Sequence, residues 1–433
     1  MSPVEIGVIG CLILLGLLLT SMPVAFAMLA SGVVGFALIV NPSAAFSMVS
    51  ADLYETFSSY SLTVIPLFVM MGQIAFHAGI SRRMFRTAYV WIGHLQGGLA
   101  MATVGACAGF GAICGSGPAT AATMSAVALP EMKRYGYADS LASGTVAAGG
   151  SLGMLIPPSV VFIVYALMTE QSIGDLFLAG IIPGILIALL FCLSIYFSCA
   201  GNGSLGPAGP RHSWKERFQS LTGVIETLLL FFLVMGGMFF GIFTPIEAAA
   251  VGTAGSFIIA ILQKEMSLHK LKMIIFETVR TSSMIFFIVA GAVIFGRFLA
   301  VSRIPFAVAG FFVSLPLPGW GIMIIIILFF LFAGCFIDAL ALILLTIPIF
   351  YPVILELGFD PVWFGVIVVV ITQMGVITPP VGVNVYVVSG IERDIPLTAI
   401  FKGAMPYLLM LLLSALILIV FPQLSLFLPG LLR

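Results

Sequence analysis

The chain carries very little charge for its length. Its 433 residues include only 17 acidic and 17 basic side chains, so charged residues make up 8% of the sequence, against roughly 25% in a soluble protein. Apolar residues make up 61%. Because so few charges cannot cover a soluble surface, the composition predicts an all-helical polytopic protein whose solvent is the bilayer. A formal net charge of zero argues against nucleic acid as a partner.

The sequence also lacks the patterns of metal binding and catalysis. None of its six cysteines and four histidines stands at the spacing of a metal pair. We therefore interpret the cysteines as small buried apolar residues and expect no transition metal. No stretch is long enough for a separate soluble domain, and no catalytic pair stands at a usable spacing. The sequence thus predicts that the protein is not an enzyme and has no cofactor.

Long apolar stretches dominate what is present. A bilayer crossing takes about 20 residues, and eight stretches reach or approach that length. Two more, 139–169 and 362–391, are apolar but broken by glycine and Pro-Pro, which gives ten predicted crossings. Two others, 97–130 and 318–355, have a polar or glycine-rich centre, and we interpret them as re-entrant helical hairpins. The eight predicted spans are 4–20, 23–41, 60–80, 175–199, 221–243, 245–263, 276–300 and 398–421.

Basic residues predict the orientation in the membrane. With these spans, the main lysine and arginine clusters fall on one side, which the positive-inside rule makes cytoplasmic, so the N-terminus is predicted to be periplasmic. The first cluster belongs to 82–95, which has the pattern of an amphipathic helix at the interface. The hydrophilic stretch 201–222 is predicted to be a cytoplasmic connecting loop. The clusters are Arg82-Arg83-Arg86, Lys133-Arg134, Arg211-Lys215-Arg217 and Lys264-Lys270-Lys272.

The sequence contains an internal repeat. Shifted by 222 residues, Pro23 falls on Pro245, and the Pro-Pro pair at 157–158 falls on the pair at 379–380. The repeat divides the chain into 1–200 and 223–433. Each part holds an odd number of predicted crossings, so the second part begins on the opposite side from the first. Inverted-topology repeats of this kind are typical of secondary transporters.

Both broken spans contain the pattern Gly-x-x-x-Pro-Pro. A proline has no N–H to give the carbonyl four residues earlier, so each pattern is predicted to leave two carbonyls without a helical donor. Such carbonyls are costly in hydrocarbon, and hard cations such as Na⁺ prefer oxygen ligands. A kink satisfied by water or by a neighbouring serine is the alternative, but two breaks at symmetric positions favour Na⁺ sites. The four carbonyls belong to Gly153, Met154, Gly375 and Val376.

The centres of the two hairpins carry polar groups. The first, Gly115–Thr120, offers hydroxyl oxygens and allows a close turn. The second, Gly334–Asp338, holds the only charged residue between Ile304 and Leu355. An ionisable residue at membrane depth indicates function, although an aspartate there can also cap the following helix. Asn384, one turn past the second Pro-Pro, is a further polar candidate.

These motifs resemble the large membrane subunit of TRAP (tripartite ATP-independent periplasmic) transporters. The resemblance covers the whole chain. It implies a bacterial inner-membrane, Na⁺-driven importer of small organic acids, such as dicarboxylates, sialic acid or other sugar acids. It also implies two partners, a separate small four-helix membrane subunit and a periplasmic substrate-binding protein. The motifs are GSGPATAATMSAVALPEM at 115–132, GxxxPPS at 153–159, FTPIEAAAVGT at 243–253, GCFIDALA around Asp338 and GVITPPVGVN at 375–384.

The resemblance also implies site residues. The first hairpin tip and the first break would carry one Na⁺ site, and the second tip and break the other. The implied sodium-binding residues are Gly115, Ser116, Gly153, Met154, Pro157, Gly334, Asp338, Gly375, Val376, Thr378 and Pro379. The implied substrate-binding residues are Ser116, Thr120, Ser159, Asp338 and Asn384.

Three functions remain open at this point. The leading one is an elevator-type transporter, in which 97–169 and 318–391 move as one body against a scaffold formed by 4–41 and 221–263. The segments 82–95 and 303–314 would then be the arms that join mover to scaffold. A stand-alone Na⁺/dicarboxylate symporter of similar design and an ion channel are the alternatives.

Overall fold

The computed structural model describes residues 2–20 and 22–432. Within these ranges every regular element is helical, and seven helices are long and apolar enough to cross a membrane. Six of the eight predicted spans belong to these seven. The other two, α1 (Pro3–Leu19) and α2 (Val24–Ile39), are slightly shorter apolar helices. The predicted all-helical polytopic fold is therefore confirmed.

The elements up to residue 201 follow the predicted order of spans, hairpin and broken span. The hairpin is α6–α7, and the first broken span is α8–η2–α9. The remaining elements are α3 (Pro42–Ser58), η1 (Tyr60–Thr63), α4 (Val64–His77), α5 (Ile80–Ile92), α6 (Gly98–Cys114), α7 (Gly117–Arg134), α8 (Asp139–Ser151), η2 (Leu152–Met154), α9 (Val160–Thr169) and α10 (Ile173–Gly201).

The rest of the chain repeats that order. The second hairpin is α17–α18, and the second broken span is α19–α20. The elements are α11 (Trp214–Ser220), α12 (Thr222–Phe231), η3 (Phe232–Gly236), α13 (Gly237–Phe239), α14 (Pro245–Leu262), α15 (Leu268–Ser302), α16 (Ile304–Ser314), α17 (Gly319–Gly334), α18 (Ala339–Glu356), α19 (Pro361–Gly375), α20 (Val383–Ile391), α21 (Leu397–Val420) and α22 (Gln423–Leu432).

Helices α3, α11 and α22 were not expected from the sequence. The predicted connecting loop 201–222 contains α11, which begins with a capping box in which Ser213 and Glu216 satisfy each other's backbone N–H. Helix α3 begins in the same local way, because the Asn41 side chain accepts the N–H of Ala44 at 2.7 Å. These caps lie outside the long apolar runs, so a search for membrane spans misses them.

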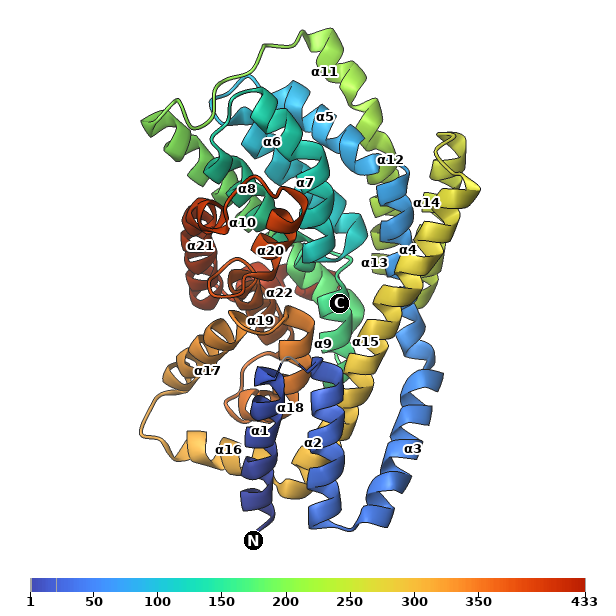
Figure 1. The fold of residues 1–433 in the computed structure, drawn as a ribbon, viewed down its shortest axis with the longest axis vertical. Coiled ribbons are helices and arrows are strands. Elements are labelled where there is room, and N and C mark those ends of the chain that lie inside the picture. The colour runs from blue at the N-terminus through green and yellow to red at the C-terminus, as the bar shows by residue number, and fades with distance from the viewer. Residues whose placement is uncertain (1, 21, 433) are drawn as a thin grey trace.

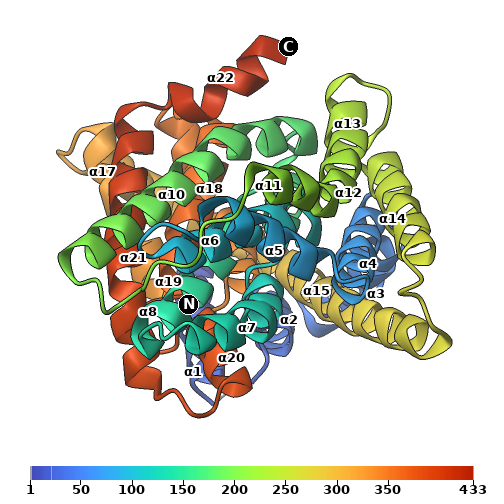
Figure 2. The same cartoon turned by 90° about the horizontal axis from the view of Figure 1, so that it is seen from above.

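The helices form two groups joined by the long helix α15 (Figures 1 and 2). On one side, α15 packs along α2 and α4, and α4 packs on α14. On the other side, α8 packs against α7 and α21, and α17 packs on α19. Both hairpins and both broken spans belong to this second group. Helices α5 and α16 lie just before the hairpins in the chain, as the sequence predicted for the two arms.

The second group is held by close backbone contact between α8 and α21. A Cβ atom added to Gly403 would lie 1.8 Å from the carbonyl oxygen of Ser140, and one added to Gly144 would lie 2.2 Å from the carbonyl carbon of Gly403. Apolar side chains gain little from leaving lipid for protein, so membrane helices associate through such small-residue contacts. This contact joins the broken span of the first repeat to the last long helix of the second.

We therefore expect Gly403→Ala to destabilise the protein by at least about 1–3 kcal/mol, the usual cost of overpacking. Gly296→Ala in α15 is the control, because a Cβ at Gly296 meets nothing within 4 Å. Thermal unfolding in detergent, followed by tryptophan fluorescence, measures the difference. Equal unfolding temperatures for the two variants would show that the α8–α21 contact can relax at no cost.

Candidate functional site

The first hairpin tip docks on the first helix break. Helix α6 is capped at its C-terminal end by Gly115, whose φ of +65° is in the left-handed region that favours glycine. The carbonyl of Gly115 accepts the N–H of Val160, the first residue of α9, at 3.2 Å. The next residue, Ser116, is the N-cap of α7, and its carbonyl accepts the hydroxyl of Thr120 at 2.8 Å. Gly153 packs against this turn, because an added Cβ would lie 2.6 Å from the Thr120 hydroxyl.

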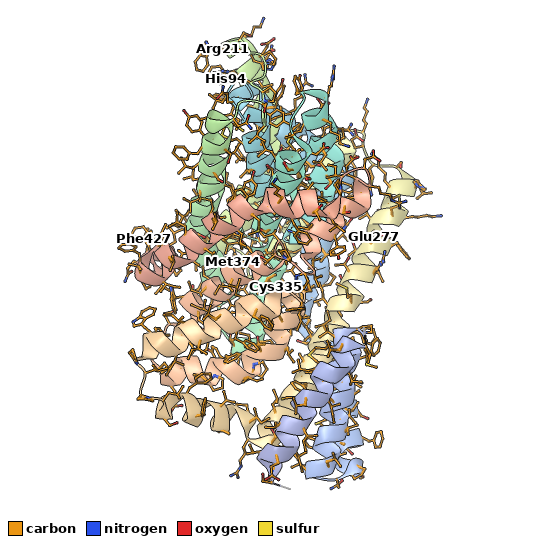
Figure 3. All side chains as sticks on the ribbon, turned by 60° about the vertical axis from the view of Figure 1, so that its left-hand side comes forward. His94, Arg211, Glu277, Cys335, Met374 and Phe427 are labelled. Carbon is orange, nitrogen blue, oxygen red and sulfur yellow. The ribbon has the colours of Figure 1, made fainter. Side chains whose placement is uncertain are left out.

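The second tip docks on the second break in the same way. The carbonyl of Cys335 accepts the N–H of Val381 at 3.3 Å. A Cβ added to Gly375 would lie 2.3 Å from the carbonyl oxygen of Gly334, so the two backbones touch. Asp338 then caps α18, and its carboxylate accepts the N–H of Leu340 at 3.1 Å. Cys335 and Met374 mark this tip and break about half-way along the molecule (Figure 3).

Three of the four carbonyls released by the prolines find donors within the protein. The Ser159 hydroxyl donates to the carbonyl of Met154 at 2.5 Å. The N–H of Thr378 donates to Gly375 at 3.2 Å, and that of Asn384 donates to Val376 at 3.0 Å. At Met154 the new donor is a neighbouring serine, which was the alternative interpretation of the break. At the second break the chain folds back and supplies backbone donors. A carbonyl oxygen has two lone pairs, so each can still bind a second partner.

Both tips face one cavity of about 660 Å³. The tip residues on its wall run from Cys114 to Ala119 and from Asp338 to Ala341. The opposite wall comes from α2, α4 and α15, with Gln73 and Thr281 as its polar residues. Among the described residues that line the cavity, Asp338 is the only charged one. The cavity thus lies between the two groups of helices, and each contributes a wall.

The structure sorts the predicted residues into two sets. Gly115, Ser116, Met154 and Asp338 line the cavity. The other residues predicted to bind sodium or substrate lie in the tips and breaks without lining it. Among these, Ser159 and Thr120 are fully buried and support the break and the tip. This second set, which does not line the cavity, comprises Thr120, Gly153, Pro157, Ser159, Gly334, Gly375, Val376, Thr378, Pro379 and Asn384.

Two residues of the second set donate side-chain hydrogen bonds to helix carbonyls. The Asn384 side chain donates to the carbonyl of Ala147 in α8 at 3.0 Å, and so joins the two broken spans. The Thr378 hydroxyl donates to the carbonyl of Met374 at 2.6 Å. Asn384 thus connects the two repeats, and Thr378 stabilises the end of α19.

Three polar residues of this region were not singled out from the sequence. Gln73 and Thr281 come from the helices opposite the tips. Gln373 in α19 is fully buried, and neither atom of its side-chain amide has a hydrogen-bond partner. For the two glutamines, the sequence signal was a side-chain amide within a long apolar run, because a buried amide is costly unless a partner satisfies it.

Paired hairpins and broken helices around a central cavity define the class of protein as a secondary transporter. The family comparison then places it more narrowly. Residues 11–424 match the model of the "Tripartite ATP-independent periplasmic transporter, DctM component", and the chain belongs to this family. The resemblance seen in the hairpin and Pro-Pro motifs is thereby confirmed.

Known proteins agree with this assignment. The C4-dicarboxylate TRAP transporter large permease protein DctM of Pseudomonas aeruginosa is 38% identical over 394 residues, covering 91% of each chain. The sialic acid TRAP transporter large permease protein SiaM of Vibrio cholerae is 34% identical over 418 residues, covering 96% of this chain and 97% of that one. The crystal structure of the Alcanivorax borkumensis YdaH transporter covers 99% of both chains with a TM-score of 0.61. At 14% identity, this last likeness shows the fold alone.

The Ser159 hydroxyl is expected to stabilise the first break. Ser159→Ala leaves the buried carbonyl of Met154 without its donor, which costs about 1–3 kcal/mol. Ser125→Ala is the matched control, because Ser125 is equally buried but donates to the carbonyl of Ala121 within a regular turn of α7. Denaturation in mixed micelles measures both variants. A Ser159→Ala protein no less stable than the control would refute this role.

Proposed function

We propose that this chain moves a small organic acid across the bacterial inner membrane, driven by Na⁺, with the cavity between the hairpin tips as the substrate site. The observation that carries the proposal is the meeting of both tips at one cavity, each tip docked on its own helix break. Na⁺ would bind where tip and break supply oxygen atoms, near Ser116 and Gly153 in one repeat and near Gly334 and Gly375 in the other.

The charges around the cavity support Na⁺ coupling. Among the described residues of its wall, Asp338 alone is charged, and its carboxylate repels an organic anion. The N-terminal ends of α7 and α18 begin at the tips and offer partial positive charge, and bound Na⁺ would supply the rest. An anionic substrate would therefore bind well only with Na⁺ in place. Such mutual dependence is what couples the two flows in a symporter.

Partners and orientation follow from the family and from the charges. The family description is tripartite, which supports a separate small membrane subunit and a periplasmic substrate-binding protein. Basic residues gather at the end of the molecule that carries α5 and α11, where His94 and Arg211 lie (Figure 3). The N-terminus lies at the opposite end (Figure 1). The positive-inside rule then supports a periplasmic N-terminus.

The proposal is tested by reconstituting the chain in vesicles with its small subunit and candidate binding proteins. Labelled C4-dicarboxylates and sialic acid are then offered under an inward Na⁺ gradient or an equal K⁺ gradient. We expect uptake only with Na⁺ and with a cognate binding protein. Uptake by the chain alone would favour a stand-alone symporter, and uptake driven by protons without Na⁺ would refute the coupling.

Asp338→Asn should lower Na⁺-driven uptake by about tenfold or more, because an interaction with a charged group contributes about 1.5–3 kcal/mol. Asp360→Asn is the matched control. Asp360 also caps a helix, accepting the N–H groups of Val362 and Trp363 at 2.8 and 3.0 Å, but it does not line the cavity. Equal activity of the two variants would show that Asp338 is only a helix cap.

We further propose that the hairpins and broken spans move as one body against α2, α4 and α15. The cavity wall is shared between the two groups, so movement between them changes its access. A reducible cross-linker between cysteines placed at Phe26 in α2 and Ala339 in the second tip should stop uptake until it is reduced. All six native cysteines are first replaced in this background.

The control link joins cysteines at Lys133 and Glu392. These residues form an ion pair of 2.6 Å between α7 and the end of α20, both within the proposed mover. This link should leave uptake intact. Full uptake with the Phe26–Ala339 link in place would exclude the elevator movement and favour a fixed site with alternating gates.

A further inference from the structure

A second cavity, of about 830 Å³, lies at the basic end of the molecule. Its walls come from α5, from the end of α7 and the turn after it, and from the connecting segment with α11. None of its lining residues belongs to the cavity between the hairpin tips. We propose that this second cavity binds a phosphate group, and that its source is the headgroup of an anionic phospholipid.

The second cavity presents hydrogen-bond donors that have no partner among the described residues. Arg82 and Arg86 extend from exposed positions of α5 into its lining. The buried Nε2 atom of His212 has no hydrogen-bond partner, and the buried hydroxyl of Tyr89 has only the Tyr135 side chain beside it. Guanidinium groups bind phosphate oxygens in a bidentate manner. A phosphate would therefore satisfy donors that the protein itself leaves open.

Most of the neighbouring carboxylates are already engaged. Arg83 is paired with Glu226 at 2.6 Å. Glu216 accepts from the backbone and hydroxyl of Ser213 at 2.8 and 3.0 Å, and it faces the Nδ1 atom of His212 at 3.5 Å.

Two further carboxylates complete the surroundings. Glu265 lies near Arg82, and its pKa is lowered chiefly by Lys270, to which it is bonded at 2.6 Å. Glu131 on α7 and Glu216 on α11 both line the cavity with Arg82 and Arg86, and the hydrogen bonds from Ser213 leave the charge of Glu216 in place. Arg82 and Arg86 are thus balanced by two carboxylates, so the attraction for a phosphate rests on charge-assisted hydrogen bonds from the guanidinium groups rather than on net charge.

The apolar part of the wall favours a lipid over free phosphate. Phe85 and Val90 of α5 and Leu99 of α6 are buried and line the cavity together with Val127 of α7. An arginine rim beside an apolar wall matches a phosphodiester with the first carbons of its acyl chains. Because α5 and α7 both line the cavity, the lipid would contact both the proposed arm and the proposed mover.

The experiment measures binding alone, so it is independent of transport and of the proposed function. The purified chain is titrated with phosphatidylglycerol in micelles of a neutral detergent, and bound lipid is counted by native mass spectrometry. The same titration is repeated with inorganic phosphate as competitor. The variants are the double change Arg82→Gln and Arg86→Gln, the single change Glu131→Gln, and the control Arg393→Gln. Arg393 is exposed, and it does not line the cavity.

We expect the double variant to weaken phosphatidylglycerol binding by about thirtyfold, since each of the two arginines near an anionic headgroup contributes about 1 kcal/mol. Glu131→Gln should strengthen binding, and Arg393→Gln should leave it unchanged. Displacement of the lipid by millimolar phosphate would show that the second cavity binds free phosphate, and would contradict the lipid as its ligand. Unchanged binding in a folded double variant, or an equal loss in the Arg393→Gln control, would overturn the proposal.

Discussion

The architecture depends on one repeated contact, in which a hairpin tip gives a backbone carbonyl to the chain just after a proline break. Gly115 accepts from Val160, and Cys335 accepts from Val381. In a membrane interior, broken backbone is tolerated only where protein or water satisfies it. Each tip therefore makes its break tolerable, and each break holds its tip at the centre of the molecule. Two such pairs, one from each repeat, build the cavity between them.

This arrangement places the polar chemistry where the two helix groups meet. The tips bring Ser116 and Asp338 to the cavity, and α4 and α15 supply the facing wall. Asn384 joins the second break to α8 of the first, so the two tip–break pairs are mechanically connected. A site built in this way can stay intact while the wall opposite it changes.

The basic end of the molecule contrasts with its centre. Among the described residues that line the cavity at the tips, one carboxylate stands in a largely apolar wall, whereas the basic end holds arginines, tyrosines and glutamates around a second cavity. The connecting segment contributes to that end by backbone contact, because Gly206 accepts the N–H of Gly97 at 2.9 Å and Leu205 accepts that of Ala138 at 3.0 Å. A stretch expected to be a loop is thus part of the packing at the base of the first hairpin.

The amino-acid sequence by itself determined the spans, the hairpins and the breaks. Apolar runs, glycines and prolines act locally, so the two Gly-x-x-x-Pro-Pro patterns predicted the helix breaks that follow α8 and α19. Helices such as α3 were missed because short polar caps started them outside the apolar runs. Which atoms satisfy the broken backbone was decided only in three dimensions. The donors to Met154 and Val376 are residues that return to them after the break, and Ala147 meets Asn384 across the two repeats. Hydrogen bonds form by proximity in the fold, which spacing along the chain does not specify.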